Sequence, residues 1–242
     1  MSTSTFTSPL ELFPHGERVL PSEESSCSSA RDFAAQRRWF FLTKRVIDVV
    51  GSTAGLILLL PLMLAVATLI RLQSPGPLLF RQTRIGRGGR TFRLLKFRTM
   101  VPDAETHLAQ LEGRNESPCG VLFKIRDDPR ITPLGRFLRR SSLDELPQLI
   151  NVFRGEMSLV GPRPLQLRDC ERLEACDPAS YARRLTVPPG ITGAWQVGGR
   201  SDTGYDTMLR LDLEYMDRLA LSRDLAILCR TLFVVLKSRG AY

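Results

Sequence analysis

Two adjacent carboxylates, Asp144 and Glu145, stand in the stretch RRSSLDELPQL, shortly after two arginines and just before a proline. A carboxylate can attack phosphorus, and one or two carboxylates together with substrate oxygens can hold a hard Mg²⁺ ion. Arg139 and Arg140 could bind phosphate oxygens through their guanidinium groups. The stretch is therefore a candidate site for phosphate chemistry in which the two acids divide the roles of nucleophile and metal ligand.

The same stretch also has a structural interpretation. Ser142 to Glu145 match the capping-box pattern S-x-x-E, in which the serine caps a helix and the glutamate closes the box. Pro147 fits best in the first turn of a helix, which places the predicted helix start near Asp144. Both carboxylates would then lie at a helix N-terminus, where unpaired N–H groups also bind phosphate. The pattern alone leaves capping and phosphate chemistry both open.

A long apolar segment precedes these residues. Val49 to Ile70 is a run of 22 residues without a charge, which is long enough to span a bilayer. Pro61 sits at its centre, where it removes a helical hydrogen bond and bends the axis. Basic residues flank both ends, which favours keeping both ends on the cytoplasmic side. We therefore predict a re-entrant helix-break-helix over residues 41–73 in preference to a helix that crosses the membrane.

The rest of the chain divides into a tail and a catalytic domain. Residues 1–40 are polar and rich in serine and threonine, which predicts a disordered tail without the form of a signal peptide. Residues 74–242 are predicted to form one catalytic domain. Five cysteines without a CxxC pair, and only two histidines, indicate neither a disulfide framework nor a zinc site. The net charge of +9 over 242 residues indicates an anionic partner.

Much of that charge lies directly after the apolar segment. Residues 71–98 contain eight basic residues and no acid, and Gly88 and Gly89 predict the turn of a short β-hairpin there. This basic stripe would meet anionic lipid head groups. For most of its arginines, a solvated, membrane-facing patch without a chemical role is the simpler interpretation. Nucleic acid is not expected as a partner, because no nucleic-acid module surrounds the stripe.

Several motifs together carry a family resemblance. They are KFRTM, LDELPQL, MSLVGPRP, PGITG and LDLEYM. With them, the chain from Thr43 to Leu236 closely resembles the bacterial sugar transferases, the monotopic polyprenyl-phosphate phosphoglycosyl transferases.

The resemblance implies a reaction in two steps. An aspartate attacks the sugar-bearing phosphate of a UDP-sugar and releases UMP, and polyprenyl (undecaprenyl) phosphate then removes the sugar phosphate from the enzyme. The product begins the assembly of a glycan or exopolysaccharide. The implied location is the cytoplasmic face of the bacterial inner membrane, in contact with membrane lipid, and the implied cofactor is Mg²⁺.

The resemblance also assigns roles to individual residues. By matching motifs, Asp144 is the nucleophile and Glu145 is the Mg²⁺ ligand. The positions that match polar residues around the phosphates, or an acid lining the site, are Lys96, Arg139, Arg163 and Asp212. Pro61 matches the helix-breaking proline of the family.

Two positions depart from the family pattern. Pro188 stands where a basic residue often precedes PGITG, so its phosphate contact must be absent or come from another cation, such as Arg183, Arg184 or Arg200. Leu60 stands where small members often have serine before the helix-breaking proline.

We therefore expect an α+β, mainly helical enzyme: a re-entrant membrane helix, a β-hairpin and surface helices around one catalytic core. The alternative from another class is a non-catalytic, membrane-anchored basic scaffold that binds anionic lipid. A glycosyl transferase that forms a sugar–oxygen bond is an enzymatic alternative, which would release a nucleoside diphosphate. The sequence does not identify the sugar, the polyprenol, the downstream polymer or whether the chain forms homo-oligomers.

Overall fold

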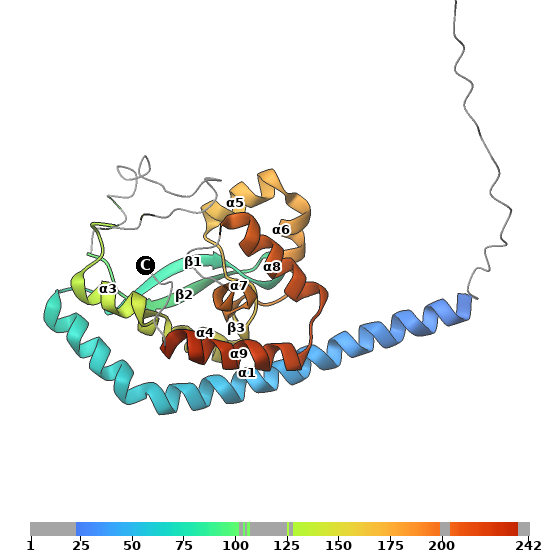
Figure 1. The fold of residues 1–242 in the computed structure, drawn as a ribbon, viewed down its shortest axis with the longest axis horizontal. Helices are drawn as coiled ribbons and strands as arrows, with labels where there is room; N and C mark the ends of the chain where they lie inside the picture. The colour runs from blue at the N-terminus through green and yellow to red at the C-terminus, as the bar shows by residue number, and fades with distance from the viewer. Residues whose placement is uncertain are drawn as a thin grey trace, which may run out of the picture. The chain divides into compact units, whose positions relative to one another are not determined.

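The computed structural model describes residues 23–101, 104, 106, 125, 128–198 and 204–236. The chain divides into two compact units, residues 1–39 and residues 40–242. The second unit is mainly helical and contains two small two-stranded sheets among its described residues (Figure 1). In chain order the elements are α1 (Glu23–Gln73), β1 (Leu79–Ile85), the 3-10 turn η1 (Arg87–Gly89), β2 (Thr91–Phe97), α3 (Pro133–Arg140), the 3-10 turn η3 (Leu143–Glu145), α4 (Gln148–Arg154), β3 (Ser158–Val160), α5 (Leu167–Cys176), α6 (Pro178–Arg184), β4 (Gly190–Thr192), α7 (Ala194–Val197), α8 (Tyr205–Asp217) and α9 (Leu221–Leu236).

The helix α1 is longer than the predicted membrane segment. It begins at Glu23, so residues 23–40 are helical where the sequence predicted a disordered tail; residues 1–22 lie outside the described residues. Residues 31–40 contain alanine, glutamine and several arginines, which favour helix. The predicted break is absent as well, because α1 continues through Pro61. Its axis bends in the cyan part of the ribbon (Figure 1), as expected when a proline removes one hydrogen bond without ending the helix.

Between Phe40 and Pro61, α1 turns three polar residues towards the rest of the second unit. Lys44, Asp48 and Ser52 lie one turn apart and are buried. Oδ1 of Asp48 accepts hydrogen bonds from Oγ of Ser158 (2.9 Å) and the backbone N–H of Leu159 (2.8 Å), at β3. The other side of α1 is apolar and exposed, and its large exposed residues are Leu42, Val46, Ile47, Val50, Ile57, Leu58, Leu60, Leu62, Leu64, Leu69 and Leu72.

The second half of α1 packs on the same domain. Val66 and Ile70 are buried in one cluster with Phe97 of β2 and Leu138 of α3. Residues on both sides of Pro61 therefore contact the rest of the second unit. By length and composition, residues 37–73 of α1 could cross a membrane.

The predicted β-hairpin is confirmed. β1 and β2 pair antiparallel, with Leu79 opposite Phe97 and Ile85 opposite Thr91. Gly88 and Gly89 supply the reversal with positive φ angles of 67° and 75°. These are conformations that glycine adopts without strain.

The helix α4 is docked on β2. Phe92 and Leu94 point to one side of β2 and form a buried cluster with Val152 of α4 and with Met157. Asn151 of α4 joins the edge of β2, since its Oδ1 accepts from the N–H of Leu95 (3.0 Å) and its Nδ2 donates to the carbonyl of Arg93 (2.8 Å). Because alternate residues of a strand share a face, Lys96 projects on the same side as Leu94.

The basic stripe is less uniform than predicted. Arg81, Arg87, Arg90 and Arg93 are exposed, as a solvated patch requires. Arg84 and Arg98, in contrast, are buried. Their guanidinium groups bind backbone carbonyls within the domain: Arg84 binds that of Pro164 (2.9 Å) and Arg98 those of Ser74 (2.8 Å) and Pro75 (3.1 Å). These two arginines therefore stabilise the fold.

Candidate active site

The two carboxylates lie on the 3-10 turn η3, not at the start of an α-helix. Ser142 has a left-handed backbone (φ 58°) and makes no side-chain capping bond, so the capping box suggested by the sequence is not formed. The α-helix begins only at Gln148, after Pro147. The prediction that the acids occupy a helix N-terminus is therefore wrong by one turn, because the chain reverses tightly at Ser142.

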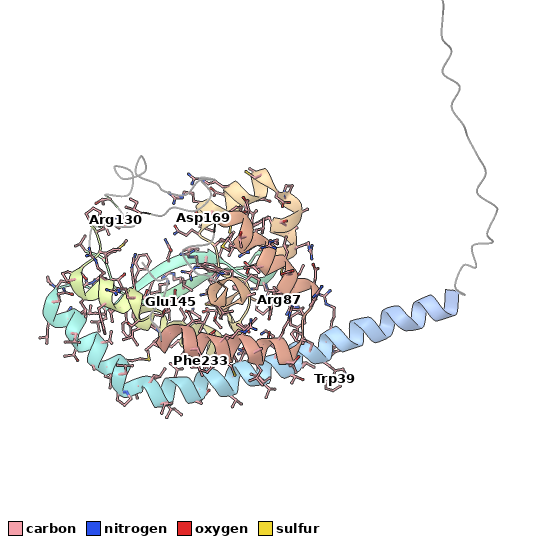
Figure 2. All side chains as sticks on the ribbon, in the orientation of Figure 1. Trp39, Arg87, Arg130, Glu145, Asp169 and Phe233 are labelled. Carbon is pink, nitrogen blue, oxygen red and sulfur yellow. The ribbon has the colours of Figure 1, made fainter. Side chains whose placement is uncertain are left out.

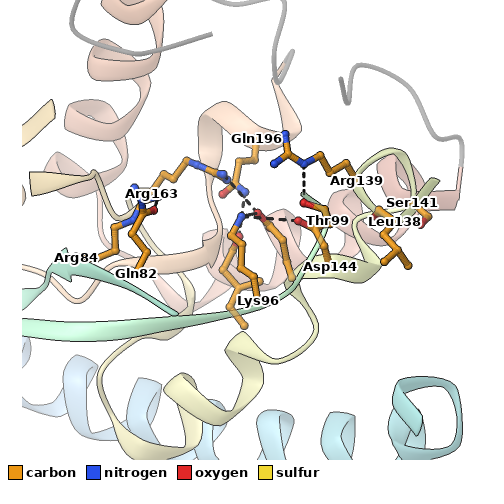
Figure 3. A network of polar contacts seen from close by, with 12 residues as sticks. Gln82, Arg84, Lys96, Thr99, Leu138, Arg139, Ser141, Asp144, Arg163 and Gln196 are labelled. Atoms are coloured by element: carbon orange, nitrogen blue, oxygen red, sulfur yellow. Dashed lines mark hydrogen bonds and ion pairs between the residues drawn. The ribbon is translucent and has the colours of Figure 1, made fainter. Parts of the chain in front are cut away.

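Lys96 is the cation nearest to the carboxylate pair. Its Nζ donates to Oε1 of Glu145 at 2.7 Å and lies 4.0 Å from Oδ2 of Asp144 (Figure 3). Asp144 is 6% exposed, so its carboxylate is largely removed from water. Lys96 belongs to β2, and η3 leads directly into α4. The docking of α4 on β2 therefore brings the two carboxylates of η3 close to Lys96.

Arg163 approaches Glu145 from the loop after β3. Its guanidinium nitrogen lies 3.4 Å from Oε1 of Glu145. Two buried arginines hold this loop by its carbonyls: Arg184 donates to the carbonyl of Arg163 (2.6 Å), and Arg84 donates to that of Pro164. The backbone that carries Arg163 is thus fixed at its own carbonyl and at the carbonyl of the next residue, Pro164.

Arg139 borders the other side of Asp144 (Figure 3). It belongs to α3, and its Nε donates to Oγ1 of Thr99 at 3.0 Å. α3 can approach this closely because Gly135 has no side chain: a Cβ there would lie 1.9 Å from the carbonyl oxygen of Thr99. The side chain of Glu145, labelled in Figure 2, is 17% exposed.

The two acids have opposite electrostatic properties. Burial, reinforced by the neighbouring charge of Glu145, raises the pKa of Asp144 to about 6. Burial would raise the pKa of Glu145 too, but Lys96 and Arg163 outweigh it and hold that pKa at about 2. Glu145 is therefore ionised at every physiological pH, whereas Asp144 titrates close to neutrality.

Asp212 lies behind the site. It is buried in an ion pair with Arg184, the residue that holds the carbonyl of Arg163. Its described contacts therefore reach the Asp144–Glu145 pair only through Arg184 and Arg163. Of the residues predicted for the site, the structure gathers Asp144, Glu145, Lys96, Arg139 and Arg163 in one place. Pro61 lies in α1, away from this group.

The carboxylate pair has the donor set for a magnesium ion that also binds substrate. Lys96 and Arg163 both contact Oε1 of Glu145, and no ion pair within the described part of the chain involves its second oxygen, which could bind a metal. Within the described part of the chain, no group of three or more potential protein ligands could hold a metal. Mg²⁺ bound here would use one or two carboxylates and complete its shell with water and phosphate oxygens, which is its usual preference.

Sequence reasoning missed three residues that position the site, Arg84, Asn151 and Arg184. All three bind backbone groups, so no motif spacing signals them.

The structure also shows which partners the candidate substitute cations near Pro188 have. Arg183 pairs with Asp217 and Arg184 with Asp212, so both are already engaged; Arg200 lies outside the described residues.

Residues 39–238 match the family described as bacterial sugar transferase, and the chain belongs to this family. This confirms the resemblance inferred from the motifs.

Three relatives illustrate its range. The galactosyl transferase CpsE of Streptococcus agalactiae is 41% identical over 201 residues, which are 83% of this chain and 43% of the relative. The exopolysaccharide production protein ExoY of Sinorhizobium fredii is 41% identical over 204 residues, 83% of this chain and 88% of the relative. The UDP-glucose:undecaprenyl-phosphate glucose-1-phosphate transferase of Caulobacter vibrioides is 44% identical over 206 residues, 83% and 72%. The chain spans less than half the length of CpsE and of several other relatives.

Proposed function

We propose that this chain is a phosphoglycosyl transferase that moves a sugar 1-phosphate from a UDP-sugar to polyprenyl phosphate. The observation that carries the proposal is the buried Asp144–Glu145 pair, set among Lys96, Arg163 and Arg139. Three cations around two carboxylates suit a diphosphate substrate. The relatives named for undecaprenyl phosphate, galactose and glucose support the same reaction class.

In the first step, a carboxylate oxygen of Asp144 forms a bond to the phosphorus that carries the sugar. The bond from that phosphorus to the oxygen bridging the two phosphates breaks, and UMP leaves with the electron pair. Lys96, Arg139 and Arg163 offset the charge of the phosphate oxygens, and each is held in place before substrate arrives. Mg²⁺ held by Glu145 would neutralise further charge on the same oxygens.

In the second step, a phosphate oxygen of polyprenyl phosphate attacks the same phosphorus. The bond to Asp144 breaks, the carboxylate is regenerated, and polyprenyl diphosphate sugar leaves. Each step exchanges one P–O bond for another, so no additional reactant is required. Asp144 must be ionised for the first step, and its pKa of about 6 leaves it mostly ionised at neutral pH.

We propose further that α1 enters the membrane and leaves on the same, cytoplasmic, side of the bacterial inner membrane. Residues near both ends of the apolar segment contact the domain: Lys44 pairs with Asp224 of α9 (2.5 Å), and Ile70 packs near Leu138 of α3. A helix crossing the bilayer would carry one of these contacts to the opposite face. The exposed apolar side of α1, with Leu58 79% exposed, suits contact with acyl chains.

The decisive experiment measures UMP release from a panel of UDP-sugars by purified protein with Mg²⁺ and polyprenyl phosphate. UDP-galactose and UDP-glucose are the first donors to test. We expect release by the wild type and none by Asp144→Asn, whose amide has the same shape but is a poor nucleophile. UDP as the product would favour a glycosyl transferase. Equal UMP release by both proteins would remove Asp144 from its role, and a scaffold would release nothing from any donor.

The metal role of Glu145 has a separate test. Glu145→Gln keeps the shape of the side chain but removes its charge, so we expect a lower rate and at least a tenfold higher Mg²⁺ concentration for the half-maximal rate. A Mg²⁺ titration of UMP release checks this, with Glu174→Gln, at an exposed position of α5, as the control for losing one acidic charge elsewhere. An unchanged Mg²⁺ dependence would assign Glu145 to ordering Lys96 and Arg163 alone.

A further inference from the structure

Gln196 has a buried hydrogen-bond acceptor that no described residue of the protein uses. Its side chain points into the space between Arg163 and Arg139 (Figure 3). Nε2 donates to the carbonyl of Ile191 at 2.9 Å, which fixes the orientation of the amide. The other end, Oε1, is buried and has no hydrogen-bond partner among the residues that the structure describes. A buried acceptor without a donor is unfavourable, and a bound ligand that supplies an N–H or O–H would relieve this.

The position of Gln196 follows from the parallel pair β3 and β4. The carboxyl ends of parallel strands meet at one edge, where α/β proteins commonly bind ligands. The loop after β3 carries Arg163, and α7 after β4 carries Gln196. A Cβ on Gly193 would lie 2.4 Å from the carbonyl oxygen of Gly161 and 3.7 Å from Oε1 of Gln196. The free acceptor therefore lies beside the loop that leads to Arg163.

The short helix α7 is fixed in this position. Trp195 packs against the buried cluster that contains Leu165, Leu173 and Met208. Its ring lies 5.8 Å from the guanidinium carbon of Arg163. These contacts hold Trp195 against the core. Gln196 is thus preorganised for a ligand.

We propose that Gln196 binds the nucleotide sugar by accepting a hydrogen bond from its uncharged part. Ionised phosphates are acceptors only and cannot donate to Oε1, whereas the neighbouring cations suit them. The donor to Gln196 is therefore a hydroxyl of the transferred sugar or of the ribose, or the N3–H of uracil, which makes Gln196 a specificity residue. This inference rests on the proposed function.

The test is a double-mutant cycle in which one change is made in the protein and the other in the substrate. Gln196→Met keeps the length of the side chain and removes the acceptor. The substrates are the accepted UDP-sugar, analogues that each lack one sugar hydroxyl, and an analogue methylated at uracil N3; kcat/KM for UMP release is measured for each. The wild type should lose about tenfold or more with the analogue that lacks the donor. Gln196→Met should be slow with the parent sugar and lose nothing further with that analogue.

Gln166→Met is the matched control. Gln166 is half-buried and makes one long contact with Gln82 (3.4 Å), so its variant should show the wild-type penalties for every analogue. Thermal unfolding of both variants verifies that they are folded. A penalty that the wild type shows with one analogue and Gln196→Met does not show supports the inference. The analogue concerned, a deoxy sugar or the N3-methylated uracil, identifies the donor.

Equal penalties in the wild type and Gln196→Met for all analogues would overturn the inference and leave the proposed function intact. The absence of UMP release by the wild type with any donor would overturn both.

Discussion

Asp144 and Glu145 are adjacent in the chain, yet their surroundings give them different chemistry. Lys96 lies 2.7 Å from Glu145 but 4.0 Å from Asp144. Glu145 keeps its charge through this contact, whereas burial favours the neutral form of Asp144. Environments that push the pKa values of two acids apart commonly separate their roles. A permanently charged residue suits a metal, and a less stabilised carboxylate suits a nucleophile.

This difference predicts the pH dependence of the first step. Because only ionised Asp144 attacks, kcat/KM for UMP release should fall as the pH drops through the pKa of Asp144, which is about 6 without metal and would be lowered by Mg²⁺ at Glu145. Glu145 adds no inflection, since its pKa is about 2. A pH profile from 5 to 8 at saturating Mg²⁺ tests this, with stability monitored at each pH. A flat profile would show that Asp144 is ionised throughout.

The raised pKa of Asp144 also predicts an effect on stability. Its pKa rises from 3.8 to about 6 on folding, so the folded state holds the proton more tightly than the unfolded state. The resulting stabilisation is complete below pH 3.8 and is lost as the pH rises through 6. At pH 8, Asp144→Asn should therefore be more stable than the wild type, by on the order of 3 kcal/mol without Mg²⁺.

Thermal unfolding at pH 8 and pH 3 compares the two proteins. The melting temperatures should differ at pH 8 and converge at pH 3, where Asp144 is neutral in both the folded and the unfolded state. A wild type that is the more stable protein at pH 8 would mean that its carboxylate is stabilised in the folded state.

The residues of the site differed in how far the sequence could predict them. Asp144, Glu145, Lys96 and Arg163 stand in distinctive motifs, and the structure brings their side chains into contact. Arg84 looked like one of many surface arginines in the basic stripe. Its role depends on the carbonyl of Pro164, 80 residues further along the chain. Such contacts cannot be predicted without the fold, since every residue has a backbone carbonyl that an arginine could bind.

At the scale of elements, η3 shows the same limit. Ser142, Glu145 and Pro147 satisfied two helix-start patterns at once, and both patterns concern local hydrogen bonds. The structure instead has a left-handed residue at Ser142, a 3-10 turn and a later α-helix. The hairpin could be predicted because its glycines and alternating residues determine the turn locally. The docking of α3 and α4 on β2 depends on contacts between distant segments.

Gly135 tests how strictly α3 must approach β2. In Gly135→Ala, the new Cβ would fall 1.9 Å from the carbonyl oxygen of Thr99, so α3 must move and carry Arg139 with it. We expect a stability loss of about 1–3 kcal/mol, as for overpacking, and a severalfold higher KM for the UDP-sugar. Gly204→Ala is the control, since no atom lies within 4 Å of its added Cβ. Wild-type unfolding and KM in Gly135→Ala would show that α3 adjusts without moving Arg139.

At the scale of the whole molecule, the part of α1 between Phe40 and Pro61 reverses the usual arrangement of an amphipathic helix. Its buried side holds Lys44, Asp48 and Ser52, whereas its exposed side is apolar. α9, which contacts α1 through the Lys44–Asp224 pair, also exposes Leu232 and Phe233 (Figure 2). Exposed apolar surface of this extent marks a membrane or protein contact. Water surrounding this side would therefore be unfavourable.

The orientation of this apolar side leads to the topology prediction. If α1 dips into one leaflet and both its ends stay with the domain, reporters fused before Met1 and after Tyr242 should both lie in the cytoplasm. A fluorescent protein that matures only in the cytoplasm should be bright at either end, and alkaline phosphatase, active only outside, should be silent at either end. Each reporter thus controls for the other. Phosphatase activity at one end with fluorescence at the other would establish a crossing helix. The contacts of Lys44 and Ile70 could then not both persist in the membrane.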